Sequence, residues 1–231
     1  MILLAMDTST SAITVAVHNG RRVLAERSVL DARAHTEHLA LLLAEALAAA
    51  GLGPADVTDV AVGVGPGPFT GLRVGLVTAR TFAHALGVPC HGVVSLDALA
   101  HEAVRGATGG GMGELVVATD ARRREVYWAR YRAEGDRVTR LTAPAVAHPA
   151  DVADEVAGLP AVGRGALLYP EVFPQGVEPL DVSADALAEV ALQQIADGVE
   201  VGVDALYLRR PDAQPSAGVK STLVAPRGDR A

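Results

Sequence analysis

Small hydroxyl residues and an aspartate follow the first apolar run of the chain. Five apolar residues end at Asp7, and Thr8, Ser9 and Thr10 come directly after it. A turn of such residues can donate backbone amides to a phosphate, and an aspartate beside it can position a metal ion or a water molecule. Alternatively, the aspartate caps its own turn. Asp7, Thr8 and Ser9 are therefore candidate phosphate contacts.

A glycine-rich segment supplies the second set of candidates. Residues 65–71 read GPGPFTG and lie between an apolar run and a segment of helical character. Amides at a helix N-terminus can hold an anion, which makes Gly65, Gly67 and Thr70 candidate phosphate contacts. However, the segment lacks the Gly-Lys-Ser/Thr of a phosphate-binding loop, and its two prolines have no amide to donate. The alternative is a stiff loop that presents Phe69.

Other patterns that could support nucleophilic or metal chemistry are incomplete. Cys90 and His91 are neighbours on a predicted strand, so their side chains point to opposite faces. His35 and His38 lack the HExxH spacing of zinc hydrolases and a nearby third ligand. We therefore expect no catalytic residue and no metal site. The arginines at 122–124 are interpreted as a solvated face, because the chain as a whole is acidic.

Composition excludes several classes of protein. With 231 residues, of which 50% are hydrophobic, the chain can bury a sizeable core and is neither disordered nor a multi-domain assembly. A net charge of −7 and 3% aromatic residues disfavour an RNA-binding module, so any RNA contact would need a local patch. One cysteine excludes an internal disulfide, and no apolar run is long enough to span a membrane. We expect a cytoplasmic protein.

The elements that position the candidate residues alternate between strands and helices. Strands are predicted at 2–6, 13–17, 23–29, 59–64 and 88–94, and helices at 35–50, 73–86 and 95–105. Ser95 is expected to cap the third helix. This alternation predicts an α/β fold with some parallel strand pairing.

The pattern begins again in the second half of the chain. Residues 115–120 can be laid on residues 2–7, and both runs end in aspartate, at Asp120 and Asp7. We interpret this as an internal duplication. The Asp120 turn is bulky and basic, which favours a self-capped turn there over a phosphate site. The predicted units are a first lobe at 1–105, a second, shorter lobe at 106–210 and a loose tail at 211–231.

Two helices of the first lobe carry more apolar surface than one core can bury. The helix at 35–50 is apolar almost all round, so one side is expected to face a partner. On the helix at 73–86, Gly75, Ala79 and Ala83 form a row of small residues that would let another helix approach closely. Together these helices predict a docking surface.

Several of these motifs together resemble the TsaB (YeaZ) family of the bacterial tRNA threonylcarbamoyladenosine machinery. The resemblance rests on the helix that begins at His35 and on the blocks MDTS (6–9), GPGPFTGLRVG (65–75), VSLDAL (94–99), DAR (120–122), EVY (125–127) and YLR (207–209). It covers nearly the whole chain up to the tail. One departure is Pro68, where the family more often has serine, and this weakens the phosphate hypothesis.

The resemblance implies both a fold and a role. The fold is the duplicated, two-lobed actin-like fold of sugar kinases, Hsp-seventy chaperones and actin (ASKHA), with a reduced second lobe. The role is that of a non-catalytic subunit that dimerises with TsaD, the enzyme that threonylcarbamoylates the adenosine beside the anticodon in tRNAs reading codons that start with A. The ATPase TsaE joins this complex, and tRNA is reached through it.

The same resemblance implies where partners bind. The chain alone is expected to form a homodimer and to hold no cofactor of its own, with ATP or ADP only at the partner interface. The expected interface comes from the two first-lobe helices: His35, His38, Leu41, Leu42, Glu45, Arg73, Gly75, Leu76, Ala79, Arg80 and Ala83. The alternatives are a small actin-like ATPase or kinase that uses Asp7, Thr8 and Asp120, and a metallopeptidase-like protein whose ligands we do not find.

Overall fold

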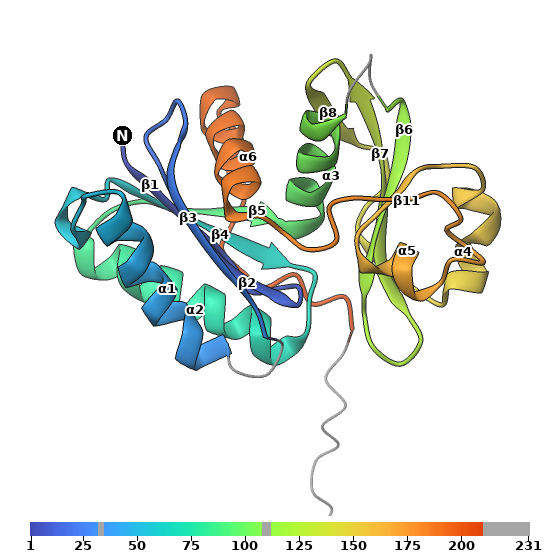
Figure 1. The fold of residues 1–231 in the computed structure, drawn as a ribbon, viewed down its shortest axis with the longest axis horizontal. Helices are drawn as coiled ribbons and strands as arrows, with labels where there is room; N and C mark the ends of the chain where they lie inside the picture. Colours follow the sequence, from blue (N-terminus) through green and yellow to red (C-terminus); the bar gives the residue numbers. More distant parts are fainter. Residues whose placement is uncertain (32–34, 108–111, 210–231) are drawn as a thin grey trace, which may run out of the picture.

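Two mixed β-sheets and the helices that cover them make up the protein, shown as a computed structural model in Figure 1. The structure describes residues 1–31, 35–107 and 112–209, with the side chains of residues 35 and 36 left out. The predicted tail at 211–231 lies outside the described residues. None of the described helices is long and apolar enough to cross a membrane.

The first sheet has the strand order β3-β2-β1-β4-β5. Its strands are β1 (Leu3–Asp7), β2 (Ala12–His18), β3 (Val23–Leu30), β4 (Asp59–Gly65) and β5 (Cys90–Val94). The first three form an antiparallel meander, and β1, β4 and β5 are parallel. Both β1 and β2 are buried along their whole length, because helices cover the two faces of this sheet.

The second sheet repeats this order in a smaller form. Its path is β11-β10-β6-β7-β8, with β9 paired to β7. The strands are β6 (Glu114–Asp120), β7 (Val126–Glu134), β8 (Arg137–Arg140), β9 (Ala145–Ala147), β10 (Ala161–Val162) and β11 (Gly176–Val177). Again the first three strands are antiparallel, and β6, β10 and β11 are parallel. The duplicated, two-lobed actin-like fold is therefore confirmed, with a reduced second lobe.

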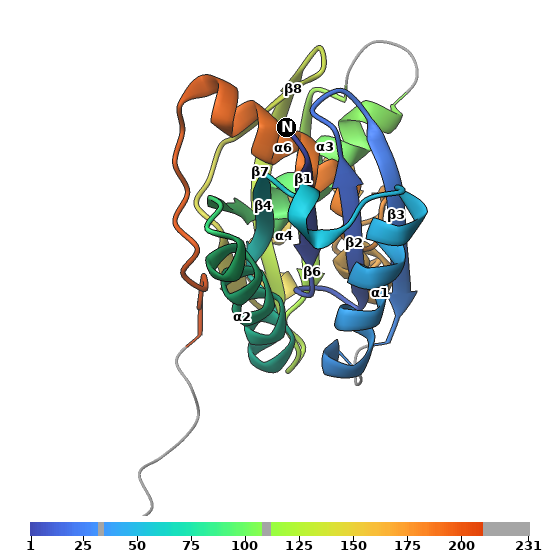
Figure 2. The same ribbon diagram turned by 90° about the vertical axis from the view of Figure 1, so that its left-hand side faces the viewer.

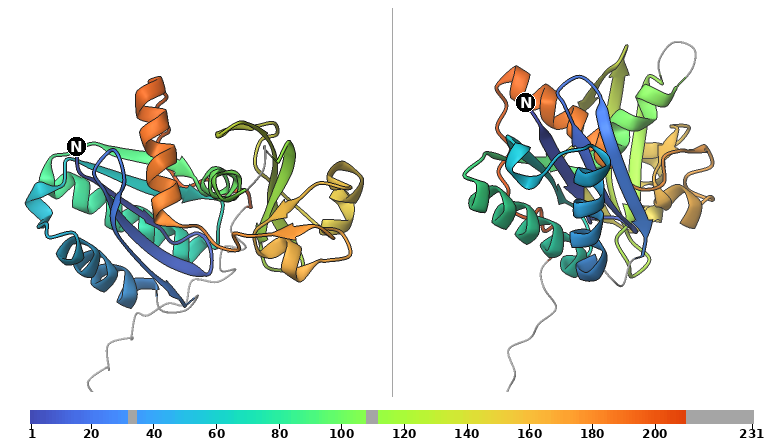
Figure 3. Two further views of the ribbon diagram at one scale, coloured as in Figure 1. Left: turned by 45° about the horizontal axis from the view of Figure 1, so that its top comes forward. Right: turned by 60° about the vertical axis from the view of Figure 1, so that its left-hand side comes forward.

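Helices lie on both faces of the first sheet (Figure 3). One face carries α1 (His35–Ala49) and α2 (Phe69–Leu86), with the short 3-10 helix Pro54–Asp56 beside β4. The other face carries α6 (Ala184–Asp197), which begins at the N-cap Ser183 and ends at Gly198 in the left-handed conformation. In the second lobe, α4 (Pro149–Val156) and α5 (Arg164–Leu168) cover the outer face of the sheet.

The lobes are joined by a pair of helices, α3 (Ser95–Gly106) and α6. α3 packs on the second sheet, α6 packs on the first, and the two helices contact each other (Figure 1). The main core is continuous through this pair, from Leu3 in the first sheet through Leu187 of α6 to Leu115 in the second. A division into 1–105 and 106–210 therefore misplaces α6, because the apolar face of this helix completes the first lobe.

The segment after α6 returns along the edge of the first sheet, as Figure 2 shows. The Gly92 amide donates to the Val201 carbonyl at 3.1 Å, and the Leu206 amide donates to the Val64 carbonyl at 2.8 Å. This covers the open edge of β5 and brings residues 207–209 to the boundary between the lobes.

Candidate functional site

A hollow of about 290 Å³ lies where the two lobes meet. The β1–β2 turn and the start of α2 form its wall in the first lobe, and the β6–β7 turn and α5 form its wall in the second. Most of its polar lining is hydroxyl or charged: Ser9, Thr10, Ser11, Thr70, Thr119, Asp120, Arg122, Arg164 and Asp181. Two of the candidate phosphate contacts, Ser9 and Thr70, line this hollow between the duplicated halves.

Asp7 does not face this hollow. Its side chain is fully buried, and one oxygen accepts from the Ser9 amide at 2.6 Å and the Ser9 hydroxyl at 2.7 Å. The other oxygen accepts from the Ser95 hydroxyl at 2.6 Å, and Ser95 Oγ in turn accepts from the Gly65 amide at 3.2 Å. Burial raises the pKa of Asp7 despite these hydrogen bonds. The self-capped turn is the alternative that the structure supports.

The Asp7 network also corrects the expected cap of α3. The N-cap is Val94, which makes no side-chain cap hydrogen bond, and Ser95 is the first helical residue. The Ser95 hydroxyl is instead committed to Asp7, so it ties α3 to β1 and to the end of β4. A buried carboxylate is costly unless it accepts hydrogen bonds, and the Ser95 hydroxyl supplies one of them.

Thr8 and the glycines beside it hold α2 against the β1–β2 turn. The Thr8 hydroxyl donates to the Gly71 carbonyl at 2.7 Å and accepts from the Gly75 amide at 3.1 Å. A Cβ on Gly75 would lie 2.4 Å from Thr8 Oγ1, so this approach requires glycine. The row predicted to accept a partner helix therefore packs inward, and Gly75, Ala79 and Ala83 are buried.

The six candidate phosphate contacts thus divide into two groups. Ser9 and Thr70 border the interlobe hollow. Asp7, Thr8 and Gly65 are buried, with the hydrogen bonds just described made inside the first lobe. Gly67 is buried against the Ser9 backbone. The residues of this buried group do not line the hollow, and their phosphate role stays a prediction.

The β6–β7 turn on the opposite wall has an unusual backbone. Asp120 accepts from the Arg122 amide at 2.7 Å, which confirms the self-capped turn. Arg122, Arg123 and Arg124 follow one another in the left-handed region, with φ of 60°, 56° and 62°. Residues with a Cβ lose roughly 1–2 kcal/mol each there, so three in succession are a rare and costly arrangement.

The outer face of α1 and α2 keeps apolar side chains in solvent. Leu41 is 55% exposed and Val77 is 62% exposed. The same two helices also expose Ala44 and Ala48 and the charged Glu45, Arg73 and Arg80. We call these seven residues the α1–α2 face. Of the other expected interface residues, Leu42, Gly75, Leu76, Ala79 and Ala83 are buried in the first lobe and do not present a surface.

The two histidines expected at the interface lie at the start of α1. His35 begins the helix, and its side chain lies outside the described part. His38 is half-buried, with Nε2 at 3.5 Å from a carboxylate oxygen of Asp31.

Comparison with known proteins agrees with this architecture. A family model described as "TsaD: tRNA N6-adenosine threonylcarbamoyltransferase" matches residues 28–225. The tRNA threonylcarbamoyladenosine biosynthesis protein TsaB of Escherichia coli is 31% identical over 227 residues, which cover 90% of this chain and 95% of that one. The chain belongs to the TsaB family. An uncharacterised protein of Mycobacterium leprae is 44% identical over 233 residues, and the match covers 96% of this chain but 59% of that longer protein.

A solved structure extends the family assignment to the fold. The structure described as YeaZ from Pseudomonas aeruginosa superposes with a TM-score of 0.78 at 31% identity, covering 90% of this chain and 99% of that one. The TsaB-family assignment and the actin-like fold inferred from strand order therefore agree.

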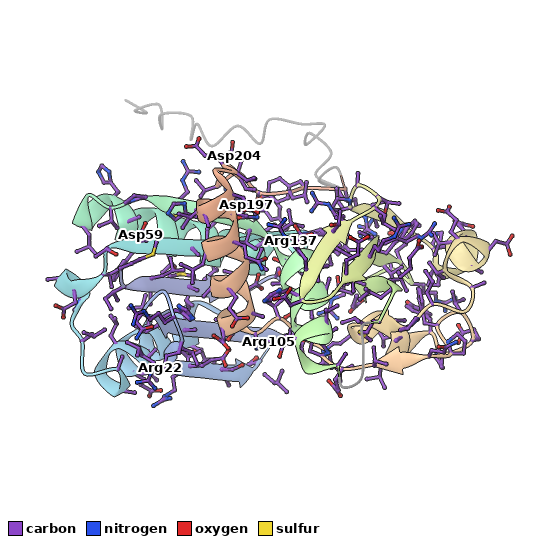
Figure 4. All side chains as sticks on the ribbon, turned by 90° about the horizontal axis from the view of Figure 1, so that it is seen from above. Arg22, Asp59, Arg105, Arg137, Asp197 and Asp204 are labelled. Carbon is purple, nitrogen blue, oxygen red and sulfur yellow. The ribbon has the colours of Figure 1, made fainter. Side chains whose placement is uncertain are left out.

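In this TsaB-family chain, charged residues reinforce the α3–α6 pair between the lobes. Arg105 of α3 lies 2.9 Å from Asp185 and 2.7 Å from Glu189 of α6. His101 contacts Glu189 at 2.8 Å. Arg137 pairs with Asp197 at 2.9 Å. Figure 4 shows Arg105 and Arg137 near the boundary between the lobes. The pairs of Arg105 and His101 link α3 to α6, and the pair of Arg137 links β8 to α6.

A three-residue group beside this pair has the composition of a metal site. The ligand atoms of His18, Asp185 and Glu189 lie within 4.8 Å of one another. Each is already engaged, because His18 Nδ1 accepts from the Gly20 amide at 3.0 Å and Arg105 contacts both carboxylates. The two carboxylates of this group form with Arg105 an electrostatic link between α6 and α3.

Glu102, which also lies on α3, is expected to make the stability of the folded chain depend on pH. Burial raises its pKa from 4.5 to about 7, partly offset by Arg105. The folded state therefore holds a proton between pH 4.5 and 7 that the unfolded state has lost, so this group lowers stability as pH rises through that range. We expect Glu102→Gln to raise the melting temperature by about 3 °C at pH 8 and to leave it unchanged at pH 4.5. The rise corresponds to roughly 1 kcal/mol of unfolding free energy once solvent screening is included.

Differential scanning calorimetry of the two proteins across this pH range measures the effect. Glu155→Gln, at an exposed position on α4, is the matched control and should follow the unmodified chain at every pH. A Glu102→Gln profile parallel to that of the control would show that Glu102 does not carry the proton.

Two residues of the interlobe boundary were not identified from the sequence. Arg164 makes a two-pronged contact with Asp181, with Nη2 to Oδ2 at 2.6 Å and Nε to Oδ1 at 2.9 Å. The signal that could have marked Arg164 is the Gly163-Arg164-Gly165 turn, in which Gly163 has φ of 96°. Arg164 starts α5 at the point where β10 ends, the same relation that the 65–71 segment has to β4.

Proposed function

We propose that this chain is a non-catalytic subunit that binds a TsaD-type threonylcarbamoyltransferase through its α1–α2 face and supports modification of the adenosine beside the anticodon. The observation that carries the proposal is that apolar side chains, Leu41 of α1 and Val77 of α2, are exposed on helices that also expose charged residues. An apolar patch with a polar rim is the usual composition of a protein interface. The names of the TsaB relatives supply the pathway.

The buried Asp7 network supports a role without catalysis. An actin-like ATPase would need a carboxylate at the end of β1 that can reach a metal-bound nucleotide between the lobes. Here both oxygens of Asp7 accept hydrogen bonds, one from Ser9 and the other from Ser95. We therefore place the chemistry, and any ATP or ADP, on the partner side of the complex, with a TsaE-type ATPase and tRNA joining there, in the cytoplasm.

Molar mass by light scattering tests the proposal. We expect the chain alone to run as a homodimer and to form a one-to-one complex when mixed with the TsaD homologue of the same organism. Leu41→Glu places an unpaired charge at the centre of the face and should weaken both associations more than about tenfold, because a charge buried in an interface without a partner is strongly unfavourable.

Leu167→Glu is the matched control, because Leu167 is 61% exposed on α5 of the other lobe. It should leave both associations unchanged. Equal association of the Leu41→Glu and control proteins would remove the α1–α2 face from the interface. ATP turnover by the isolated chain that is lost in Asp7→Asn would instead favour the ATPase alternative.

A further inference from the structure

A second hollow, of about 380 Å³, lies beside the first and opens between the lobes. Its first-lobe wall is residues 67–69, its second-lobe wall is residues 121–123 with Tyr127, and residues 207–209 complete it. We call it the arginine–aromatic hollow. It adjoins the α1–α2 face at Arg73, which lies over the Phe69 ring, whereas Leu41 and Val77 do not line it.

Aromatic rings are concentrated at this hollow. Three of the eight aromatic residues of the chain line it: Phe69, Tyr127 and Tyr207. Phe69 is 47% exposed, Tyr207 is 45% exposed, and their ring centroids are 5.2 Å apart. Large apolar rings left in solvent at the mouth of a hollow offer a platform on which a planar base can stack.

Arginines surround the same opening. Arg122, Arg123 and Arg209 line it, and the Arg73 guanidinium lies 4.8 Å from the centre of the Phe69 ring. The Arg122 side chain is 63% exposed and reaches Asp120 at 3.1 Å, so its remaining donors face solvent. Guanidinium groups bind phosphates through paired hydrogen bonds, which makes this a local basic patch on a chain of net charge −7.

The backbone holds these arginines in place before any ligand arrives. Two backbone hydrogen bonds close the left-handed turn at 122–124. The Ala121 amide donates to the Glu125 carbonyl at 3.0 Å, and the Glu125 amide donates to the Arg122 carbonyl at 3.0 Å. Arg209 donates to the Ala121 carbonyl at 3.1 Å and pairs with Glu125. A costly conformation that the surrounding contacts fix in this way is typical of a binding site.

We propose that the arginine–aromatic hollow binds a nucleotide of single-stranded RNA, with the base against Phe69 and Tyr207 and the phosphates on Arg122 and Arg123. A base must be unstacked and unpaired to enter such a hollow, so single strands and loops fit and duplexes do not. The assignment rests on the proposed function only for the source of the RNA. Its test needs no partner subunit, so it can fail without affecting the docking proposal.

Fluorescence anisotropy of a labelled ten-residue oligoadenylate with the full chain provides the test. We expect saturable binding that weakens with salt, with a slope of log K against log salt of about −1.4 for two phosphates. The double variant Arg122→Ala/Arg123→Ala should bind at least tenfold more weakly. Tyr207→Leu should lose about fivefold or more, whereas Tyr207→Phe, which keeps the ring, should stay within twofold.

The matched control is the double variant Arg21→Ala/Arg22→Ala, which removes an adjacent exposed pair at the β2–β3 turn that does not line this hollow. Figure 4 labels Arg22 in the first lobe. It should bind like the unmodified chain, and the melting temperature of each variant shows that it is folded. Three outcomes would overturn the assignment. The two double arginine variants could lose affinity equally, or a duplex of the same length could bind as tightly as the single strand. The third is that AMP competes at the same concentration as the oligomer. Absence of oligoadenylate binding would also overturn the assignment and would favour a partner protein as the occupant of the hollow.

Discussion

Replacement of Asp7 by alanine is expected to lower the free energy of unfolding by about 3 kcal/mol. The carboxylate accepts three hydrogen bonds in a fully buried site, from the Ser9 amide, the Ser9 hydroxyl and the Ser95 hydroxyl. Alanine would leave these donors buried without acceptors, at roughly 1 kcal/mol or more each. Urea unfolding at pH 7, followed by circular dichroism, measures the change.

The Asp7→Asn variant is the matched control, because it keeps the shape and removes the charge. Burial raises the pKa of Asp7, so the folded state binds a proton more tightly than the unfolded state. The ionised group therefore lowers stability as pH rises from 3.8, the unfolded value, through the higher folded value. Asp7→Asn should lose less stability than Asp7→Ala and should lack this pH dependence. Equal losses in the two variants would show that the hydrogen bonds do not hold the turn.

The second large effect is expected at Gly67. A Cβ there would lie 2.5 Å from the Ser9 carbonyl oxygen and 2.8 Å from its Cα, both of which are backbone atoms. Because the backbone cannot rotate away as a side chain can, Gly67→Ala must separate the 65–71 segment from the β1–β2 turn. We expect a loss of about 3 kcal/mol in unfolding free energy, measured by urea titration.

Gly106→Ala serves as the control for this substitution. A Cβ at Gly106 would meet no atom within 4 Å, and its effect should stay within about 0.5 kcal/mol. A Gly67→Ala protein as stable as this control would mean that the loop and the turn are not in close contact in solution.

The positions of the buried strands could be predicted from the sequence because each of them is a nearly unbroken apolar run. Residues 2–6 and 115–119 carry the same signal, and each is followed by an antiparallel partner. The tight contact between Gly75 and Thr8 could not be predicted. A row of small residues allows close approach by any backbone, and only the three-dimensional structure shows that the nearest one belongs to the same lobe.

The candidate site was predicted by residue type, and the structure changed the role of several residues. The aspartate and hydroxyl residues at 7–10 do form a turn, but the partner of Asp7 is Ser95, 88 positions away. Hydrogen bonds between such distant residues leave no periodic signal in a sequence. The arginines at 122–124 are exposed, in agreement with their interpretation as a solvated face, but their left-handed backbone could not be predicted from the sequence.

The return of α6 to the first sheet also determines how the chain can fold during synthesis. When residue 105 leaves the ribosome, the inner face of β1 and β2 has no helix to cover it, because α6 begins only at Ala184. The nascent first lobe must therefore wait for more than 90 further residues, including the whole second sheet, before α6 is complete and can close its core. We therefore expect folding to be late and concerted, with the two lobes gaining their stability together once α6 has left the ribosome.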